Sequence, residues 1–357
     1  MGAWTRSPLT ELEPRRVCLI KPSALGDVVH GLHVLSGLRK RWPQAKFSWV
    51  VNDGFADLLE GHPDLSEVIV FRRREAKTWG GMWNVGWELA ARLRRAKFDL
   101  TIDMQGLLRS GLMTLATGAA RRVGFANARE GSRWTYTDFV PVPTMETPWL
   151  SRYWPVVKAF GGPDEIQPAR FGVTTGHRLS AAEHLAGLPR PLIGLHPGAQ
   201  WVTKRWPPEN FAKLVELANR HCGASLVLVG GPGDREAADQ IAAALPRQSI
   251  NLAGKTSLLE LAALLERLDV FVSGDSGPMH LAAAVGCPCV SLFTCTSPLR
   301  FAPKGPQHQF VATTLACKES RLKTCASLAC MSELSVARVW PTLRATLESI
   351  LRRGAAA

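Results

Sequence analysis

The segment 269–280, Asp-Val-Phe-Val-Ser-Gly-Asp-Ser-Gly-Pro-Met-His, holds several side chains that could bind a substrate. A short apolar run closed by Gly274, a polar turn and an alanine-rich stretch predict a strand, a tight loop and a helix. Backbone N–H groups at the start of a helix favour an anion such as a phosphate. Asp275, Ser276 and His280 would surround that anion. The alternative is that Asp275 or Ser276 only caps the helix.

A second group of polar side chains follows the apolar strand expected at 16–20. Lys21, Ser23 and Asp27 lie between this strand and a segment whose apolar residues recur at helical spacing. Ligands of open α/β sheets bind beyond the carboxyl ends of the strands, so chemistry is expected at these three residues. Taken alone, Asp27 directly before the helix is better explained as an N-cap.

Strands and helices alternate along the chain, which predicts an α/β fold. Further strands are expected at 47–51, 68–71, 100–104, 192–196 and 226–229, and helices at 82–96, 209–221 and 235–245. A capping box at Ser257 and Glu260 opens another helix. Residues 120–148 show little periodicity and are expected to form a long loop region.

The composition of 161–191, rich in Gly and Pro and without an apolar pattern, predicts a connection between two domains. We place one domain at 1–165, a linker at 166–190 and a second domain at 191–330. Two successive βα domains imply a cleft that both sets of strand ends face. The tail 331–357 has apolar residues at helical spacing and is expected to form an amphipathic helix.

The net charge of +13 over 357 residues favours an anionic partner, such as a nucleic acid, a phospholipid surface or a phosphorylated substrate. No motif of stacking aromatic and basic residues supports nucleic acid. No apolar run approaches the roughly 20 residues that span a bilayer, and the start lacks a secretory core, so the cytoplasm is the expected location.

Trp83 and Trp87 are four residues apart on an expected helix, close to the basic cluster 72–74. Packing in the core is the favoured explanation of aromatic residues at this spacing. The alternative is contact with a membrane surface, where aromatic and basic side chains cooperate.

The chain has eight cysteines, and without a signal peptide they are expected to be thiols. Cys317, Cys325 and Cys330 match no zinc spacing, and three ligands would need a fourth. Metal binding at these three residues is therefore a minority hypothesis.

Five motifs in order resemble glycosyltransferase family 9, the ADP-heptose lipopolysaccharide heptosyltransferases, and within it most closely the heptosyltransferase I members. The motifs are residues 21–30, 103–106, 196–199 with 203–207, 274–280 and the late pair Cys330-Met331. The resemblance implies a GT-B type architecture, with two Rossmann-like doubly wound domains, the first for the acceptor and the second for the nucleotide sugar. It also implies that the final helix crosses back onto the first domain.

The resemblance further implies the reaction. Heptose would move from ADP-heptose, with inversion and without a metal or cofactor, to a Kdo-type residue of the lipopolysaccharide inner core. The partners would be a nucleotide sugar and an anionic glycolipid, with peripheral contact at the cytoplasmic membrane face. The alternatives are another nucleotide sugar on a different glycan or protein acceptor, and a binding protein for nucleotide sugars or nucleic acids without catalysis.

Site residues follow from the same resemblance. Asp27 would be the general base for the acceptor hydroxyl. Lys204 would meet the diphosphate, and Ser276 with Gly277 would hold it as charge builds on the leaving group. The remaining donor contacts would be Gly198, Ala199, Asp275 and His280, and the acceptor contacts Lys21, Ser23 and Arg129. In the heptosyltransferase I members an acidic residue contacts the ribose of the donor. The matching turn here ends at Asp234, so either Asp234 takes that role or this chain uses a different donor.

Overall fold

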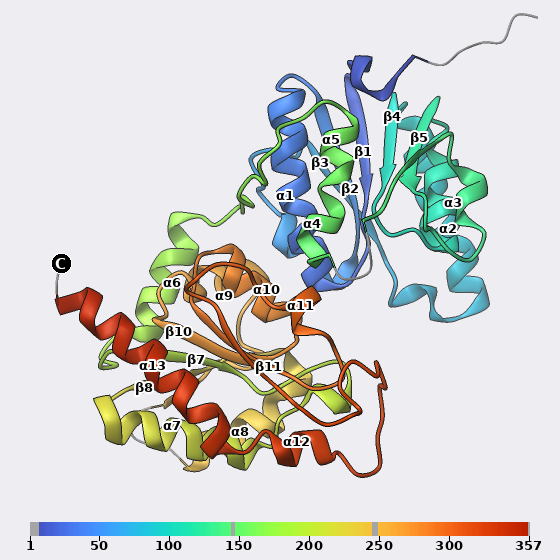
Figure 1. The fold of residues 1–357 in the computed structure, drawn as a ribbon. Helices are drawn as coiled ribbons and strands as arrows, with labels where there is room; N and C mark the ends of the chain where they lie inside the picture. Colours follow the sequence, from blue (N-terminus) through green and yellow to red (C-terminus); the bar gives the residue numbers. More distant parts are fainter. Residues whose placement is uncertain (1–6, 144–146, 245–248, 356–357) are drawn as a thin grey trace, which may run out of the picture. The chain divides into compact units, whose positions relative to one another are not determined.

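The computed structural model describes residues 7–143, 147–244 and 249–355. The chain divides into two compact units, Met1–Gly172 and Val173–Ala357. Each unit contains a six-stranded sheet whose strands are all parallel, with helices packed on it (Figure 1). The prediction of an α/β fold with two Rossmann-like doubly wound domains is confirmed.

The first sheet has the strand order β3-β2-β1-β4-β5-β6. Its strands are β1 (Arg16–Ile20), β2 (Lys46–Asn52), β3 (Glu67–Phe71), β4 (Leu100–Asp103), β5 (Arg121–Phe125) and β6 (Asp138–Val140). Its α-helices are α1 (Leu25–Arg41), α2 (Trp79–Arg95), α3 (Leu108–Thr117), α4 (Trp149–Tyr153) and α5 (Pro155–Ala159), and short 3₁₀ turns include Ser132–Thr135. The central strands are apolar on both faces because helices cover both faces.

Two helical layers enclose the first sheet (Figure 1). Helix α1 packs with α4 and α5, and α2 packs with α3 in the other layer. Val85, Leu89 and Leu93 of α2 pack into a core with Ile20 and Val50 of the sheet. The apolar side of α2 therefore faces the strands, and its other side faces outward.

The second sheet repeats the topology, with the order β12-β11-β10-β7-β8-β9. Its strands are β7 (Leu192–His196), β8 (Ser225–Leu228), β9 (Ser249–Asn251), β10 (Val270–Gly274), β11 (Cys289–Phe293) and β12 (Gln309–Ala312). The helices are α6 (Thr175–Leu185), α7 (Pro208–Cys222), α8 (Arg235–Ala244), α9 (Leu258–Leu265), α10 (Gly277–Ala284), α11 (Pro298–Phe301), α12 (Ala329–Glu333) and α13 (Val336–Ala355). The Ser257–Glu260 capping box that opens α9 is present.

Two sequence-based expectations differ from the structure. The region 120–148 is not one long loop, because β5 and β6 lie in it and the Arg121 side chain joins them through Asp138. The expected linker 166–190 contains α6, which packs on α9 within the second unit. Within the second unit, the apolar side of α13 packs into the core, against α7 and β12.

Within the described ranges, no helix has the length and apolar character needed to cross a bilayer.

Candidate active site

In each sheet the strand order reverses beside the first strand of the unit. This occurs between β1 and β4 in the first sheet and between β7 and β10 in the second. The loops that leave two such neighbouring strands run to opposite faces of the sheet, which opens a crevice at their carboxyl ends. Residues 21–27 follow β1, and residues 275–280 follow β10. The two motifs therefore lie at the positions where an α/β fold binds its ligands.

In the first unit, Lys21 and Asp27 form an ion pair. The Lys21 ammonium lies 3.1 Å from Asp27 Oδ2 and donates to the Met104 carbonyl at 3.2 Å. It also lies 5.2 Å from the centre of the Tyr153 ring. The Lys21 side chain is buried, while part of the Asp27 carboxylate reaches the surface. The pair fixes the carboxylate at the end of β1, where a substrate can meet it.

Asp27 does not cap α1. The helix begins at Leu25, its N-cap residue is Ala24, and no side chain supplies a capping hydrogen bond. Asp27 is thus the third residue of the helix, inside its first turn, where a negative charge is favoured by the helix dipole. The N-cap interpretation of Asp27 is wrong.

The turn after β4 completes this end of the first unit. Asp103 Oδ1 accepts from the N–H groups of Gln105 and Gly106 at 2.8 and 3.1 Å, and Oδ2 accepts from the Tyr136 hydroxyl at 2.7 Å. Burial raises the pKa of Asp103, although these hydrogen bonds act in the opposite direction. Asp103 therefore shapes the turn and is enclosed by it.

This turn also connects to the other predicted acceptor residues. The Ser23 N–H donates to Gln105 Oε1 at 3.4 Å, and the Arg129 N–H donates to the Gly106 carbonyl at 2.9 Å. The structure brings the loops that carry Lys21, Ser23 and Arg129 together at one end of the sheet. The Arg129 side chain is exposed.

In the second unit, Lys204 and Asp275 form the corresponding ion pair. Lys204 Nζ donates to Asp275 Oδ2 at 2.6 Å, and the same oxygen accepts from the Thr296 hydroxyl at 2.8 Å. His280 Nε2 lies 3.8 Å from Asp275 Oδ1. Asp275 is therefore not a helix cap: it holds the lysine and is surrounded by polar groups from the turn 202–204, the loop after β11 and helix α10.

Close packing of neighbouring strands holds the turn that carries Lys204. A Cβ atom on Gly274 would lie 2.5 Å from the Lys204 carbonyl oxygen, so only glycine allows β10 to end against the turn 202–204. The Thr294 hydroxyl donates to the Thr203 carbonyl at 2.5 Å. The Lys204 ammonium lies 4.4 Å from the centre of the Trp201 ring, a cation–π contact.

The N-terminus of α10 carries no side-chain cap. Ser276 is the N-cap residue, but its hydroxyl makes no capping hydrogen bond and instead lies 3.2 Å from His196 Nδ1. Pro278, within the first turn, has no N–H to satisfy. The N–H groups of the first turn thus lack side-chain acceptors among the described residues, close to Lys204. A positive side chain and a helix N-terminus together suit a phosphate.

Asp234 has a structural role in this site. Its Oδ2 accepts from the Gly231 N–H at 2.8 Å and lies 3.3 Å from His196 Nε2. A Cβ atom on Gly198 would lie 1.9 Å from Asp234 Oδ1, so the loop after β7 packs directly on the carboxylate. Burial acts to raise the pKa of Asp234, but the hydrogen bond and charge interaction with His196 and the Gly231 amide outweigh it, and the pKa is lowered.

Three residues of these networks have no role predicted from the sequence. His196 connects Ser276 with Asp234, Thr296 donates to Asp275, and Tyr136 donates to Asp103. His196 was recognisable as the last residue of a strand and part of a motif. Thr296 and Tyr136 have no such signal because their partners are 21 and 33 residues away.

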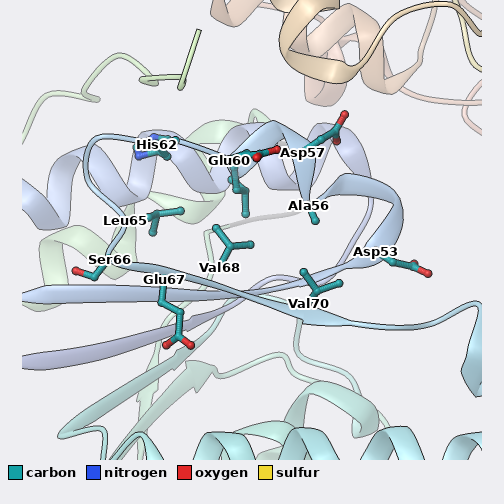
Figure 2. Close-up of a pocket in the computed structure, with 12 residues that line it drawn as sticks. Asp53, Ala56, Asp57, Glu60, His62, Leu65, Ser66, Glu67, Val68 and Val70 are labelled. Atoms are coloured by element: carbon teal, nitrogen blue, oxygen red, sulfur yellow. The ribbon is translucent and has the colours of Figure 1, made fainter. Parts of the chain in front are cut away.

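A pocket of about 560 Å³ lies elsewhere on the first unit, between β3 and the segment that precedes it (Figure 2). Its lining includes four carboxylates, Asp53, Asp57, Glu60 and Glu67. Such a lining repels phosphate groups, and Glu67 stands at the amino end of β3. This pocket is therefore unsuited to a nucleotide.

Across the residues whose positions are described, no group of three His, Cys, Asp or Glu side chains is arranged to hold a metal ion. Cys317 is exposed and Cys330 is buried, with Cys325 between these extremes. The minority hypothesis of a metal at these three cysteines is thus not supported.

Comparison with known proteins assigns the family. The sequence profile of "Glycosyltransferase family 9 (heptosyltransferase)" matches residues 86–330. Lipopolysaccharide heptosyltransferase 1 of Pseudomonas aeruginosa is 33% identical over 320 residues, which cover 87% of each chain. The lipopolysaccharide core heptosyltransferase OpsX of Haemophilus influenzae is 27% identical over 300 residues, covering 83% of this chain and 84% of that protein.

Solved structures agree in fold. A glycosyl transferase family 9 protein from Veillonella parvula superposes with a TM-score of 0.79 at 24% identity, covering 94% of this chain and 97% of that one. The E. coli heptosyltransferase WaaC with ADP gives 0.74 at 23% identity, covering 93% and 99%. The fold is of the GT-B type that the sequence predicts, and the chain belongs to glycosyltransferase family 9, the heptosyltransferases.

Proposed function

We propose that this glycosyltransferase moves heptose from ADP-heptose to a Kdo-type residue of the lipopolysaccharide inner core, with inversion at the anomeric carbon. The observation that carries the proposal is the N-terminus of α10, which has no side-chain cap and lies beside Lys204. The names of the relatives, which are lipopolysaccharide heptosyltransferases, support the sugar and the acceptor class.

On the donor side, we assign the diphosphate to Lys204 and the first turn of α10, with Ser276 and Gly277 at its start. Negative charge grows on the terminal phosphate as its bond to the sugar breaks. A fixed ammonium group and oriented N–H groups stabilise this charge without having to reorganise. Asp275 and His280 hold Lys204 in place. We assign the backbone N–H groups of Gly198 and Ala199 to the nucleotide.

On the acceptor side, we assign the general base to Asp27. Its carboxylate takes the proton of the acceptor hydroxyl while the hydroxyl oxygen forms a bond to the anomeric carbon. The bond from that carbon to the diphosphate breaks on the opposite side, and ADP leaves with the electron pair. Lys21 orients the carboxylate, and Ser23 and Arg129 are assigned to the anionic groups of the acceptor sugar.

The geometry of Asp234 argues against a contact with the donor, since His196 and the Gly231 amide already occupy its Oδ2. Its Oδ1 lies against Gly198. We therefore assign Asp234 to holding the loop 197–199 rather than to the ribose. With Asp234 in this role, the nucleobase and the sugar of the donor are identified by experiment.

The test is a donor screen with purified protein and a Kdo-lipid A acceptor, in which nucleotide release from ADP-, GDP- and UDP-sugars is measured. We expect release from ADP-heptose only, and only when the acceptor is present. A chelator such as EDTA should leave the rate unchanged, because the proposal assigns charge stabilisation to Lys204 and α10. Tight binding and turnover of another nucleotide sugar would contradict the assigned donor while leaving the enzyme class intact.

We also propose that the protein works in the cytoplasm, in peripheral contact with the inner membrane, because its acceptor is a glycolipid. Nucleic acid is not among the proposed partners, since the basic residues are distributed over both halves of the chain.

A further inference from the structure

Large apolar side chains are exposed on the layer of the first unit formed by α2 and α3. Trp83 and Trp87 of α2 are 75% and 72% exposed, and Trp134 in the turn 132–135 is 92% exposed. The expectation that Trp83 and Trp87 pack in the core is wrong. Helix α2 uses Val85, Leu89 and Leu93 for that purpose, and both tryptophans lie on its opposite side.

Helix α3 exposes its leucines and buries small and polar side chains. Its leucines Leu108, Leu112 and Leu115, at positions i, i+4 and i+7, are each about half exposed. Its buried side is formed largely by small and polar residues, among them Ser110 and Thr114. A helix of a water-soluble domain normally turns its leucines inward. The stability of this unit therefore does not explain the leucine stripe.

These residues belong to one surface. Helix α2 packs along α3, and α3 packs against the turn 132–135, where a Cβ atom on Gly111 would touch Ser132 and Thr135 (Figure 1). Because both helices cover the same face of the sheet, their outward sides face the same way. We call this set of six the outer apolar patch: Trp83, Trp87, Leu108, Leu112, Leu115 and Trp134.

Basic side chains accompany the patch. Arg94 lies at the end of α2 against Gly118, Arg109 is in the first turn of α3, and Arg133 neighbours Trp134. All three are exposed, and none forms an ion pair within the parts of the chain that the structure describes. The nearby acids are engaged: Glu88 pairs with Arg72, and Glu130 accepts from the Leu108 N–H.

We propose that the outer apolar patch docks on the surface of an anionic phospholipid bilayer. Indole rings favour the level of the lipid headgroups, leucines enter the acyl boundary, and arginines bind the lipid phosphates. The three arginines favour an anionic surface over an uncharged protein groove. The benefit to the enzyme rests on the proposed function, because a glycolipid acceptor is embedded in such a surface.

The experiment measures co-sedimentation of the full chain with vesicles of phosphatidylethanolamine and phosphatidylglycerol, without donor or acceptor. A loss of transfer activity therefore cannot be mistaken for a loss of docking. Trp83→Ser combined with Trp87→Ser should lower the partition coefficient roughly tenfold or more. Each of Arg94→Glu, Arg109→Glu and Arg133→Glu should lower it by about fivefold or more.

Matched controls come from the second unit. Leu179→Ser removes an exposed leucine of α6, and Arg267→Glu reverses an exposed arginine, both outside the patch. These variants should bind vesicles within about twofold of the unaltered chain. Thermal unfolding of every variant checks that the unit is folded, which we expect because all altered side chains are exposed.

Four results would overturn the proposal. The first is no binding of the unaltered chain to anionic vesicles. The second is equal loss of binding in patch and control variants. The third is self-association, measured by sedimentation, that depends on Trp83 and Trp87 and persists without lipid, because the patch would then be an interface between copies of the chain. Binding to phosphatidylcholine vesicles as tight as to anionic ones would also contradict the role of the arginines.

Discussion

The two units have the same sheet topology, and each has a lysine–aspartate ion pair beyond the carboxyl ends of its central strands, but the two pairs have opposite exposure. In the first unit the Lys21 side chain is 2% exposed and that of Asp27 is 24% exposed. In the second unit Lys204 is 15% exposed and Asp275 is 6% exposed. One unit buries the cation and presents the carboxylate. The other buries the carboxylate and presents the cation.

The difference shows how one fold can serve two substrates. A presented carboxylate can accept a proton from a hydroxyl, whereas a presented ammonium can meet a phosphate. The buried partner fixes the position of the presented one and, in each pair, is held by further contacts: Lys21 by the Met104 carbonyl, and Asp275 by Thr296. The sheet determines where the pair lies, and the loops determine which charge is accessible.

The largest effect is expected from Asp27→Asn, which keeps the size of the side chain but removes the base. We expect kcat to fall about 10²- to 10⁴-fold, the usual contribution of general base catalysis. The affinity for ADP, measured by calorimetry, should stay within about twofold because the nucleotide is assigned to the other unit. Turnover close to that of the unaltered enzyme would remove Asp27 as the base.

Glu13→Gln serves as the matched control, because Glu13 also pairs with a basic side chain, Arg41, but lies before β1. Its kcat should be unchanged. A similar loss of kcat in Glu13→Gln and Asp27→Asn would mean that general destabilisation, and not chemistry, explains the result.

The second effect is expected from Lys204→Ala, which removes the presented cation of the second unit. A hydrogen bond from a charged group contributes about 1.5–3 kcal/mol, so the affinity for ADP should fall roughly 10- to 100-fold. Binding of adenosine, which lacks phosphates, should change little. Lys213→Ala on the exposed side of α7 should bind ADP as the unaltered chain does.

Equal losses for ADP and adenosine would show that the substitution disturbs the site as a whole, for instance because Asp275 loses its lysine. Unchanged ADP affinity would contradict the phosphate role of Lys204 altogether. Either result would contradict the conclusion that the second unit presents its lysine to a phosphate, as the first unit presents its carboxylate to a hydroxyl.

The fold could be predicted largely from sequence, because buried parallel strands are continuous apolar runs. The expected bounds of β1 and β7 match the structure, those of β2 differ by one residue at each end, and those of β3 differ by one residue at its start. β5, β6, β9, β11 and β12 were not predicted. Arg121 in β5 and Asp138 in β6 pair across the sheet, a contact that separate sequence segments do not reveal.

The sequence predicts which residues belong to the site, but not which of their side chains interact. Lys21, Asp27 and Asp275 could be identified because they follow predicted strands. The pairing of Lys21 with Asp27 and of Lys204 with Asp275 depends on loop geometry and on long-range contacts such as Gly274 against Lys204. Aromatic spacing was misleading for Trp83 and Trp87, since helical periodicity identifies one side of a helix but not whether that side faces the core or the solvent.

The smallest expected effect concerns Asp103 in the first unit and Asp234 in the second. Folding shifts the pKa values of these two aspartates in opposite directions. The pKa of Asp103 is raised above its ordinary value of 3.8, chiefly by burial. The pKa of Asp234 is lowered below 3.8, because His196 and the Gly231 amide outweigh burial. Asp103 therefore binds its proton more tightly in the folded chain than in the unfolded chain, and Asp234 binds its proton less tightly.

The signs of the resulting pH dependence are opposite. Asp103 makes the free energy of unfolding decrease as pH rises from 3.8 through its raised pKa. Asp234 contributes stability that is present above 3.8 and lost as pH falls through its lowered pKa. In urea unfolding from about pH 3 to pH 7, Asp103→Asn should thus gain stability relative to the unaltered chain as pH rises. Asp234→Asn should lose stability relative to the unaltered chain as pH rises over the acidic part of the same range. Parallel slopes for the two variants would contradict the opposed environments, because a shared slope requires that both carboxylates be stabilised or destabilised alike by folding.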